Sequence, residues 1–151
     1  MKITVLAIGK TKEPDEVWGN EYLKRLRGQV TVKELTAPKG LPPLETQKAE
    51  AERLLKVLPS KAFVVLLDER GKDLTSRDFA AKMSAWQEQA VQDLVFIIGG
   101  ADGVTDTVRA KANFVLGFGK LTWPHRMVRV MLLEQIYRAQ QINAGHPYHR
   151  D

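Results

Sequence analysis

The sequence contains no cysteine. This absence excludes a disulfide scaffold, a thiolate zinc site and a cysteine nucleophile. The chain also lacks any run of about 18 apolar residues, which is the length a helix needs to cross a membrane. Its apolar start, Lys2–Ile8, is too short for a secretory signal and is typical of a first strand. These absences predict a cytoplasmic protein.

Histidine is also scarce, and its placement is informative. All three histidines, at positions 125, 146 and 149, lie in the last third of the chain. They stand beside glycine-containing segments and a basic helix candidate. Because imidazole is the side chain that ordinarily titrates near neutral pH, this concentration indicates a functional site in the C-terminal third.

Length and composition indicate one globular domain. The chain has 151 residues, of which 44% are hydrophobic, enough to form a core in a single domain spanning 1–151. The formal net charge is +5 and the isoelectric point is near 9.5. A positive balance of this size is compatible with a polyanionic partner.

Strand and helix patterns alternate along the chain. Apolar runs predict strands at Lys2–Ile8, Val30–Leu35, Ala62–Leu67, Leu94–Ile98 and Ala112–Phe118. Helical patterns cover Glu16–Leu26, Glu45–Leu58, Ser76–Gln89 and Arg126–Ala144, the third opened by a capping box with Thr75 as N-cap and Asp78 at N3. Repeated βα units predict an α/β fold, with a mostly parallel sheet and helices on both faces.

Three of the predicted strands end in unusual segments, Leu67–Lys72, Gly99–Gly103 and Phe118–Trp123. Each contains or adjoins glycine, which permits positive φ and close backbone approach. A single such segment is typical of a tight turn. Because ligands in parallel sheets bind outside the carboxyl ends of the strands, three on one edge predict a pocket.

Several ligand classes do not suit this pocket. Gly99–Gly103 matches neither the dinucleotide fingerprint nor the P-loop, and no acidic residue ends the following strand. The histidines lack the i, i+4 spacing of metal ligands, and no serine occupies a nucleophile elbow. The remaining possibility is a backbone-lined pocket for a neutral or cationic nucleoside-like ligand, without a metal.

The last predicted helix is apolar around nearly its whole circumference. We expect Thr122 to be its N-cap, with Trp123 and Pro124 in the first turn. A helix that is apolar all round is buried on several sides, and in a small domain one of those sides suits a second subunit. Glu134 and Arg138 have the i, i+4 spacing of a helical ion pair.

Because it carries the following motifs in this order, the chain resembles one protein family over its whole length. The resemblance rests on Leu67-Asp68-x-x-Gly71-Lys72, on Phe96-x-Ile98-Gly99-Gly100-x-x-Gly103 and on Thr122-x-Pro124-His125-x-x-x-Arg129. Its most specific part is Leu133-Glu134-Gln135-x-Tyr137-Arg138-Ala139, followed by Pro147-Tyr148-His149. The chain resembles the RlmH family of the SPOUT, or α/β-knot, methyltransferases.

The resemblance implies a trefoil knot at the C-terminal end, S-adenosyl-L-methionine as cofactor, and a homodimer. It also implies methyl transfer to N3 of a pseudouridine in 23S rRNA within the assembled ribosome. Carried over, the cofactor-binding residues are Leu67, Gly99, Phe118, Gly119, Lys120, Leu121, Thr122 and Trp123, and the base-facing catalytic residues are Arg129, Arg138, Tyr148 and His149. Gly117 and Gly119 replace serines that are common in the family, so backbone rather than hydroxyl contacts to the cofactor are expected there. Val104 replaces a common leucine, and we expect this change to affect only packing.

The residue inventory is compatible with this chemistry. Methyl transfer from a sulfonium donor requires orientation and exclusion of water, and N3 of a pseudouridine must lose its proton. His149 is the candidate base, with Tyr148 or Arg138 orienting the nucleobase or offsetting the developing charge. We expect His125 to be a structural residue of the helix start and His146 to have no special role.

Two alternatives remain open from the sequence alone. The basic C-terminal third would also suit a non-catalytic domain that binds RNA or the ribosome. A SPOUT methyltransferase acting on another RNA, such as a tRNA ribose, is the second. The Pro147-Tyr148-His149 tail favours the pseudouridine enzyme, and the lack of an appended RNA-binding domain suggests that the ribosome supplies much of the recognition surface.

Overall fold

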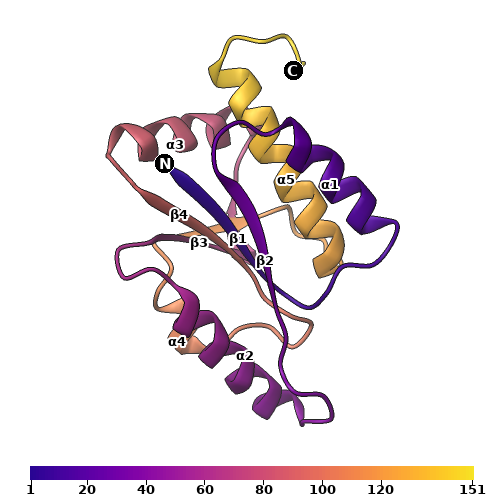
Figure 1. Cartoon of the computed structure of the whole chain (residues 1–151). Helices are drawn as coiled ribbons and strands as arrows, with labels where there is room; N and C mark the ends of the chain where they lie inside the picture. The colour runs from indigo at the N-terminus through magenta and orange to yellow at the C-terminus, as the bar shows by residue number, and fades with distance from the viewer.

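The computed structural model describes residues 1–151, in which strands and helices alternate (Figure 1). The strands are β1 (Lys2–Ile8), β2 (Val30–Leu35), β3 (Phe63–Asp73), β4 (Asp93–Ile98) and β5 (Phe114–Gly117). The helices are α1 (Asp15–Arg25), α2 (Pro43–Val57), α3 (Ser76–Glu88), α4 (Asp106–Arg109) and α5 (His125–Asn143). All the predicted elements are present, and α4 is a short helix that was not predicted.

The strands form one five-stranded sheet in the order β2-β1-β4-β3-β5. Every neighbouring pair is parallel, which confirms the predicted sheet. β1 lies between β2 and β4, with Val5 opposite Val32 on one side and Phe96 on the other. The carboxyl ends of β3, β4 and β5, three adjacent strands, therefore meet at one edge of the sheet.

Helices cover both faces of the sheet (Figure 1). On one face, α3 and α5 contribute side chains such as Phe79 and Leu132 to a core that also contains Phe96 of β4, and α1 packs beside α5. On the other face, α2 and α4 cover alternate residues of the same strands, among them Val95 and Ile97. Because both faces are buried, the central strands are continuous apolar runs rather than alternating ones.

β3 is longer than the predicted Ala62–Leu67. It bulges after Leu67 and pairs again with β5 through Lys72 and Asp73. Gly71 permits this return, because a Cβ at this position would lie 2.6 Å from the carbonyl carbon of Leu116. The bulge brings Asp73 back to the edge of the sheet. β5 is correspondingly shorter than predicted and does not extend beyond Gly117.

The predicted caps of α3 and α5 have different outcomes. The Thr75 side chain accepts from the backbone N–H of Asp78 at 3.0 Å, as the capping box predicted. The predicted N-cap of α5 was wrong, because Pro124 occupies that position without a side-chain cap. The Thr122 hydroxyl instead donates to Glu69 Oε2 at 3.0 Å, a partner distant in sequence.

None of the helices combines the length and apolar character needed to span a membrane. α5 packs against both α1 and α3, in agreement with burial on several sides. The knot that the resemblance implies stays a prediction.

Candidate active site

A cavity of about 730 Å³, here called the main cavity, opens at the edge where β3, β4 and β5 end. Three segments form most of its wall: 67–70 after β3, 98–104 after β4 and 116–125 around and after β5. These include the three segments that the sequence analysis singled out. Its size is in the range of pockets that enclose a nucleoside-sized ligand.

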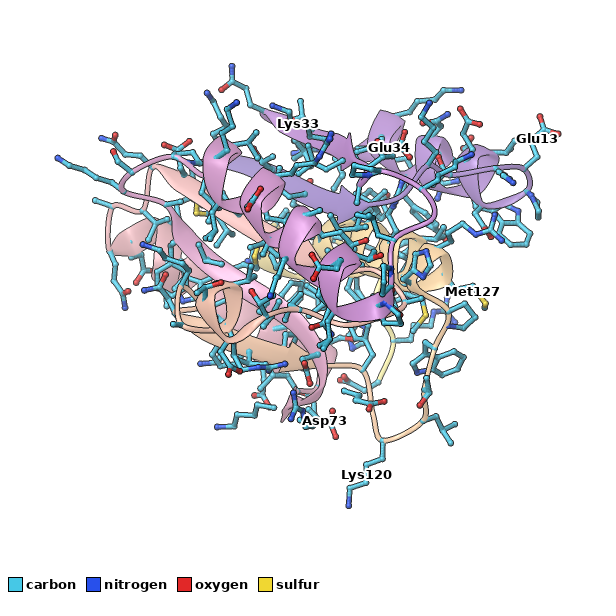
Figure 2. The ribbon with its side chains drawn as sticks, turned by 90° about the horizontal axis from the view of Figure 1, so that it is seen from below. Glu13, Lys33, Glu34, Asp73, Lys120 and Met127 are labelled. Atoms are coloured by element: carbon cyan, nitrogen blue, oxygen red, sulfur yellow. The ribbon has the colours of Figure 1, made fainter.

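Most of the predicted cofactor-binding residues line the main cavity. These are Leu67, Gly99, Phe118, Gly119, Leu121, Thr122 and Trp123. Lys120 is the exception: it is absent from the cavity wall, and Figure 2 shows it extending from the tip of its loop into solvent. The structure therefore brings seven of the eight predicted residues together around one space.

The loop between β5 and α5 is held in shape by local hydrogen bonds. The indole N–H of Trp123 donates to the Phe118 carbonyl at 3.0 Å. The Gly119 N–H donates to Asp73 Oδ1 at 2.9 Å, and Gly119 has a φ of +90°, which favours glycine. The Asp73 contact depends on the return of β3 past its bulge. These hydrogen bonds position the backbone of the loop along the main cavity.

The turn after β4 rests on a buried carboxyl group. Glu50 of α2 is 8% exposed, and its Oε2 would lie 2.9 Å from a Cβ at Gly100, so only glycine fits there without displacement. Burial, with a smaller contribution from the nearby Asp102, raises the pKa of Glu50. The Gln47 side chain donates to the Asp102 carbonyl and fixes the far end of the same turn.

The mouth of the main cavity carries charges of both signs. Asp68 accepts from Arg109 at 2.7 Å and from the backbone N–H of Arg70 at 2.8 Å. Burial acts to raise the pKa of Asp68, but these hydrogen bonds outweigh it and leave the pKa below its ordinary value. Asp68 belongs to a strand-end motif that the sequence shows, whereas Arg109 lies on the short helix α4, which no sequence pattern predicted.

His125, the first residue of α5, also lines the main cavity. Burial lowers the pKa of its imidazole, and the neighbouring Arg129 and Arg126 lower it further. Both effects favour the uncharged form of the ring. An uncharged ring at the cavity wall is compatible with a cationic ligand.

Arg129 does not join the other predicted base-facing residues. Its side chain is 4% exposed and donates to Glu34 Oε2 at 2.6 Å and to the Gly9 carbonyl at 3.0 Å. Both partners lie at the carboxyl ends of β2 and β1. The structure thus gives Arg129 a contact that joins α5 to the sheet.

Arg138, Tyr148 and His149 form a cluster at the C-terminal end of α5, here called the tail cluster. Arg138 Nη1 lies 3.0 Å from His149 Nδ1, and its guanidinium carbon lies 4.8 Å from the centre of the Tyr148 ring. Arginine can only donate, so His149 Nδ1 is the acceptor and its Nε2–H donates to Asp151 at 3.0 Å. Asp151 is held in turn by Arg77 of α3 at 2.7 Å.

The tail cluster and the main cavity are separated along α5. The last helix residue that lines the cavity is Val128. Arg138 lies ten residues further along, which at 1.5 Å per residue is about 15 Å. Between them lies a second hollow of about 430 Å³, which shares Phe118 and Gly119 with the main cavity and reaches Glu134.

No group of three or more histidine, aspartate or glutamate side chains is placed to hold a metal ion. The polar groups that surround the main cavity include arginines, the His125 ring and the carboxylates of Asp68 and Glu69, which are themselves hydrogen-bonded. Such a site can bind an uncharged ring system and a nearby cation. The structure offers no serine hydroxyl paired with a base in this cavity.

Comparisons with known proteins agree with one another. Residues 1–149 match a family model described as "Predicted SPOUT methyltransferase". The chain is 46% identical over 151 residues to a protein of Rhodospirillum centenum and 44% identical over 151 residues to one of Paramagnetospirillum magneticum, with 99% of each chain covered. It is 44% identical over 156 residues to a protein of Ruegeria pomeroyi, again over 99% of each chain. Each of these relatives is named "Ribosomal RNA large subunit methyltransferase H".

Proposed function

We propose a specific reaction for this chain, which belongs to the SPOUT methyltransferase family and within it to the RlmH group. It is a methyltransferase of large-subunit ribosomal RNA that uses S-adenosyl-L-methionine. Its target is N3 of a pseudouridine in 23S rRNA, modified in the cytoplasm within an assembled ribosome. The main cavity, built from the ends of three parallel strands, is the observation that supports this proposal best.

The main cavity fits the cofactor in size and chemistry. Leu67 and Phe118 would offer apolar surface to an adenine ring, and the turns at Gly99 and Gly119 would offer backbone groups to the ligand. Glu69, also in the wall, supplies a carboxylate that favours a cation. The bound cofactor supplies a methyl group on a positively charged sulfur, so no metal ion is required for this transfer.

The tail cluster supplies the groups that handle the nucleobase. N3 of a pseudouridine carries a proton that must leave as the nitrogen is methylated. The free lone pair of His149 is on Nδ1, which Arg138 covers in the isolated chain. With a base bound, Arg138 Nη1 would donate to a carbonyl oxygen of the base in place of His149, while Nε and Nη2 stay on Glu134. The guanidinium would offset the developing negative charge, and His149 Nδ1 would take the N3 proton. Asp151 keeps the Nε2–H oriented throughout this transfer.

A second copy of the chain brings the two parts together. Because the tail cluster lies about 15 Å along α5 from the main cavity, two antiparallel α5 helices around a two-fold axis place the tail of one subunit over the cavity of the other. Large apolar side chains are exposed where such pairing occurs, with Trp18 on α1 52% exposed, and Trp123 and Met127 38% and 40% exposed. Figure 2 shows Met127 on the outside of the molecule.

Mass-spectrometric mapping of rRNA after incubation of ribosomes with protein and cofactor tests the reaction. We expect one added methyl group on a 23S pseudouridine, and far less on ribosomes from a strain that lacks the corresponding pseudouridine synthase. Equal rates on both kinds of ribosome would point to another RNA target. Absence of methylation on every ribosomal particle would refute the proposed function.

Deletion of Tyr148–Asp151 tests the tail. These residues follow the helix break at Gly145, so we expect thermal stability to change little while methylation falls by orders of magnitude. A mixed dimer of one tail-deleted subunit and one subunit with a blocked main cavity retains one complete site only if the tail acts on the partner. An inactive mixed dimer would indicate action within one subunit, through the second hollow.

A further inference from the structure

Glu134 lies at the centre of the tail cluster and contacts more than its i, i+4 partner Arg138. Its Oε1 accepts from Arg138 Nε at 2.8 Å and lies 2.6 Å from Arg138 Nη2. The same oxygen accepts from the Tyr148 hydroxyl at 3.2 Å. One carboxylate oxygen therefore contacts both Arg138, on α5, and Tyr148, in the tail that follows the helix.

The tail cluster depends on this contact in two ways. Tyr148 is held directly, and its ring also packs edge-on against Tyr137 at 4.8 Å. His149 is held indirectly, because its Nδ1 accepts from Arg138, whose other nitrogens are bound by Glu134. Removal of the carboxylate would leave Arg138 without its partner on α5 and would take away one of the contacts that position each tail residue.

The environment of Glu134 distinguishes it from a surface ion pair. Its side chain is 17% exposed and that of Arg138 is 24% exposed, whereas the i, i+4 pair of Glu21 and Arg25 on α1 is 55% and 44% exposed. Glu134 also lines the second hollow, which shares Gly119 with the main cavity. An exposed i, i+4 pair contributes only a few tenths of a kcal/mol to a helix. Stabilisation of the helix by such a pair would not require the additional contact to Tyr148, 14 residues away.

The charge of Glu134 also influences its two partners. Its hydrogen bond is the main cause that raises the pKa of the Arg138 guanidinium. Burial first, and then Glu134, raises the pKa of the Tyr148 hydroxyl. Glu134 thus holds the Tyr148 hydroxyl and the Nε and Nη2 atoms of Arg138, and the Nη1 atom that contacts His149 is the donor left to meet a nucleobase.

We infer that Glu134 is a positioning residue for methyl transfer, which holds Arg138 and Tyr148 in the arrangement that meets the target base. This inference rests on the proposed function for its substrate. It assigns Glu134 no contact with the base. Its effect passes through the orientation of its two partners.

Glu134→Ala and Glu134→Gln, with Glu21→Gln as the matched control, test the inference. We expect Glu134→Ala to lower kcat on ribosomes by roughly 10²-fold, the scale of a misplaced catalytic group, while cofactor affinity measured by calorimetry stays within about two-fold of wild type. Glu134→Gln keeps an amide oxygen as acceptor and should restore part of kcat. Glu21→Gln should leave kcat unchanged. A kcat for Glu134→Ala within two-fold of wild type would overturn the inference.

A second measurement does not depend on activity or on a folded alanine variant. Ultraviolet titration of tyrosine ionisation in wild type and Glu134→Gln, each with and without Tyr148→Phe, isolates the Tyr148 hydroxyl. Without the carboxylate this hydroxyl should ionise at lower pH, and an unchanged titration would refute the proposed contact. If wild-type protein methylates no ribosome, the proposed function fails, but the titration still decides whether Glu134 controls Tyr148.

Discussion

Glu34→Gln is the most direct test of the structural role given to Arg129. Arg129 Nη1 lies 2.6 Å from Glu34 Oε2, and the same oxygen accepts from the Thr11 N–H at 2.6 Å. Breaking a fully buried ion pair costs about 3–5 kcal/mol, because one charge is left unpaired. Glu34 is 36% exposed and glutamine keeps one acceptor oxygen, so we expect a smaller loss, about 2–3 kcal/mol.

For a domain of this size each kcal/mol lowers the melting temperature by roughly 2–4 °C, so the expected fall is about 4–12 °C. Calorimetry at neutral pH measures it, with Glu21→Gln as the control for an exposed pair, where we expect little change. A melting temperature for Glu34→Gln within about 1 °C of wild type would show that Arg129 does not need this partner. It would return Arg129 to the list of candidates that face the base.

The pH dependence of the same variant provides an independent check. Burial acts to raise the pKa of Glu34, but hydrogen bonds from Thr11 and Arg129 outweigh it, and the net pKa lies below the ordinary value of 4.5. A carboxylate with a lowered pKa in the folded state adds stability above the unfolded-state pKa, and this contribution is lost as the pH falls through the folded-state pKa. The difference in stability between wild type and Glu34→Gln should therefore be full above about pH 5 and shrink below pH 4.5.

Three further variants test the sheet, the main cavity and the dimer. Gly71→Ala places a Cβ 2.6 Å from the Leu116 backbone, so urea unfolding should show a loss of about 1–3 kcal/mol; an unchanged midpoint would contradict the close approach of β3 and β5. Gly99→Val places its Cβ 2.7 Å from Val104 Cγ1 and should displace the turn into the main cavity, so calorimetry should show loss of cofactor binding, and undiminished affinity would remove Gly99 from the site. Trp18→Glu puts a charge on an exposed apolar surface of α1, so light scattering should show a monomer for this variant. A wild-type protein that is itself a stable monomer at micromolar concentration would refute the dimer.

The sequence predicted the elements and the position of the cavity because both depend on local patterns. Continuous apolar runs such as Leu94–Ile98 are typical of buried parallel strands, and parallel strands place their carboxyl ends at one edge. Thr75 was predicted correctly as an N-cap because its partner is Asp78, three residues away. The predictions that depended on spacing of a few residues were therefore the most accurate.

The features that the sequence did not reveal depend on distant partners. Thr122 resembles an N-cap, but in the folded chain its hydroxyl meets Glu69, 53 residues earlier. Arg129 pairs with Glu34 across 95 residues, so its burial has no local signal. The extension of β3 requires Gly71 to approach β5 closely, and a glycine in the sequence does not indicate which strand it will contact.

The central place of β1 in the sheet has a consequence for synthesis on the ribosome. β1 is made first, yet its neighbour β4 (Asp93–Ile98) and the helix α5 that covers its face emerge long afterwards. Until Leu132 and Ile136 of α5 are available, the apolar face of the sheet stays open to water. The wall of the main cavity is also incomplete until residues 116–125 have been made. The chain can therefore hold the cofactor only after about four-fifths of it has been synthesised.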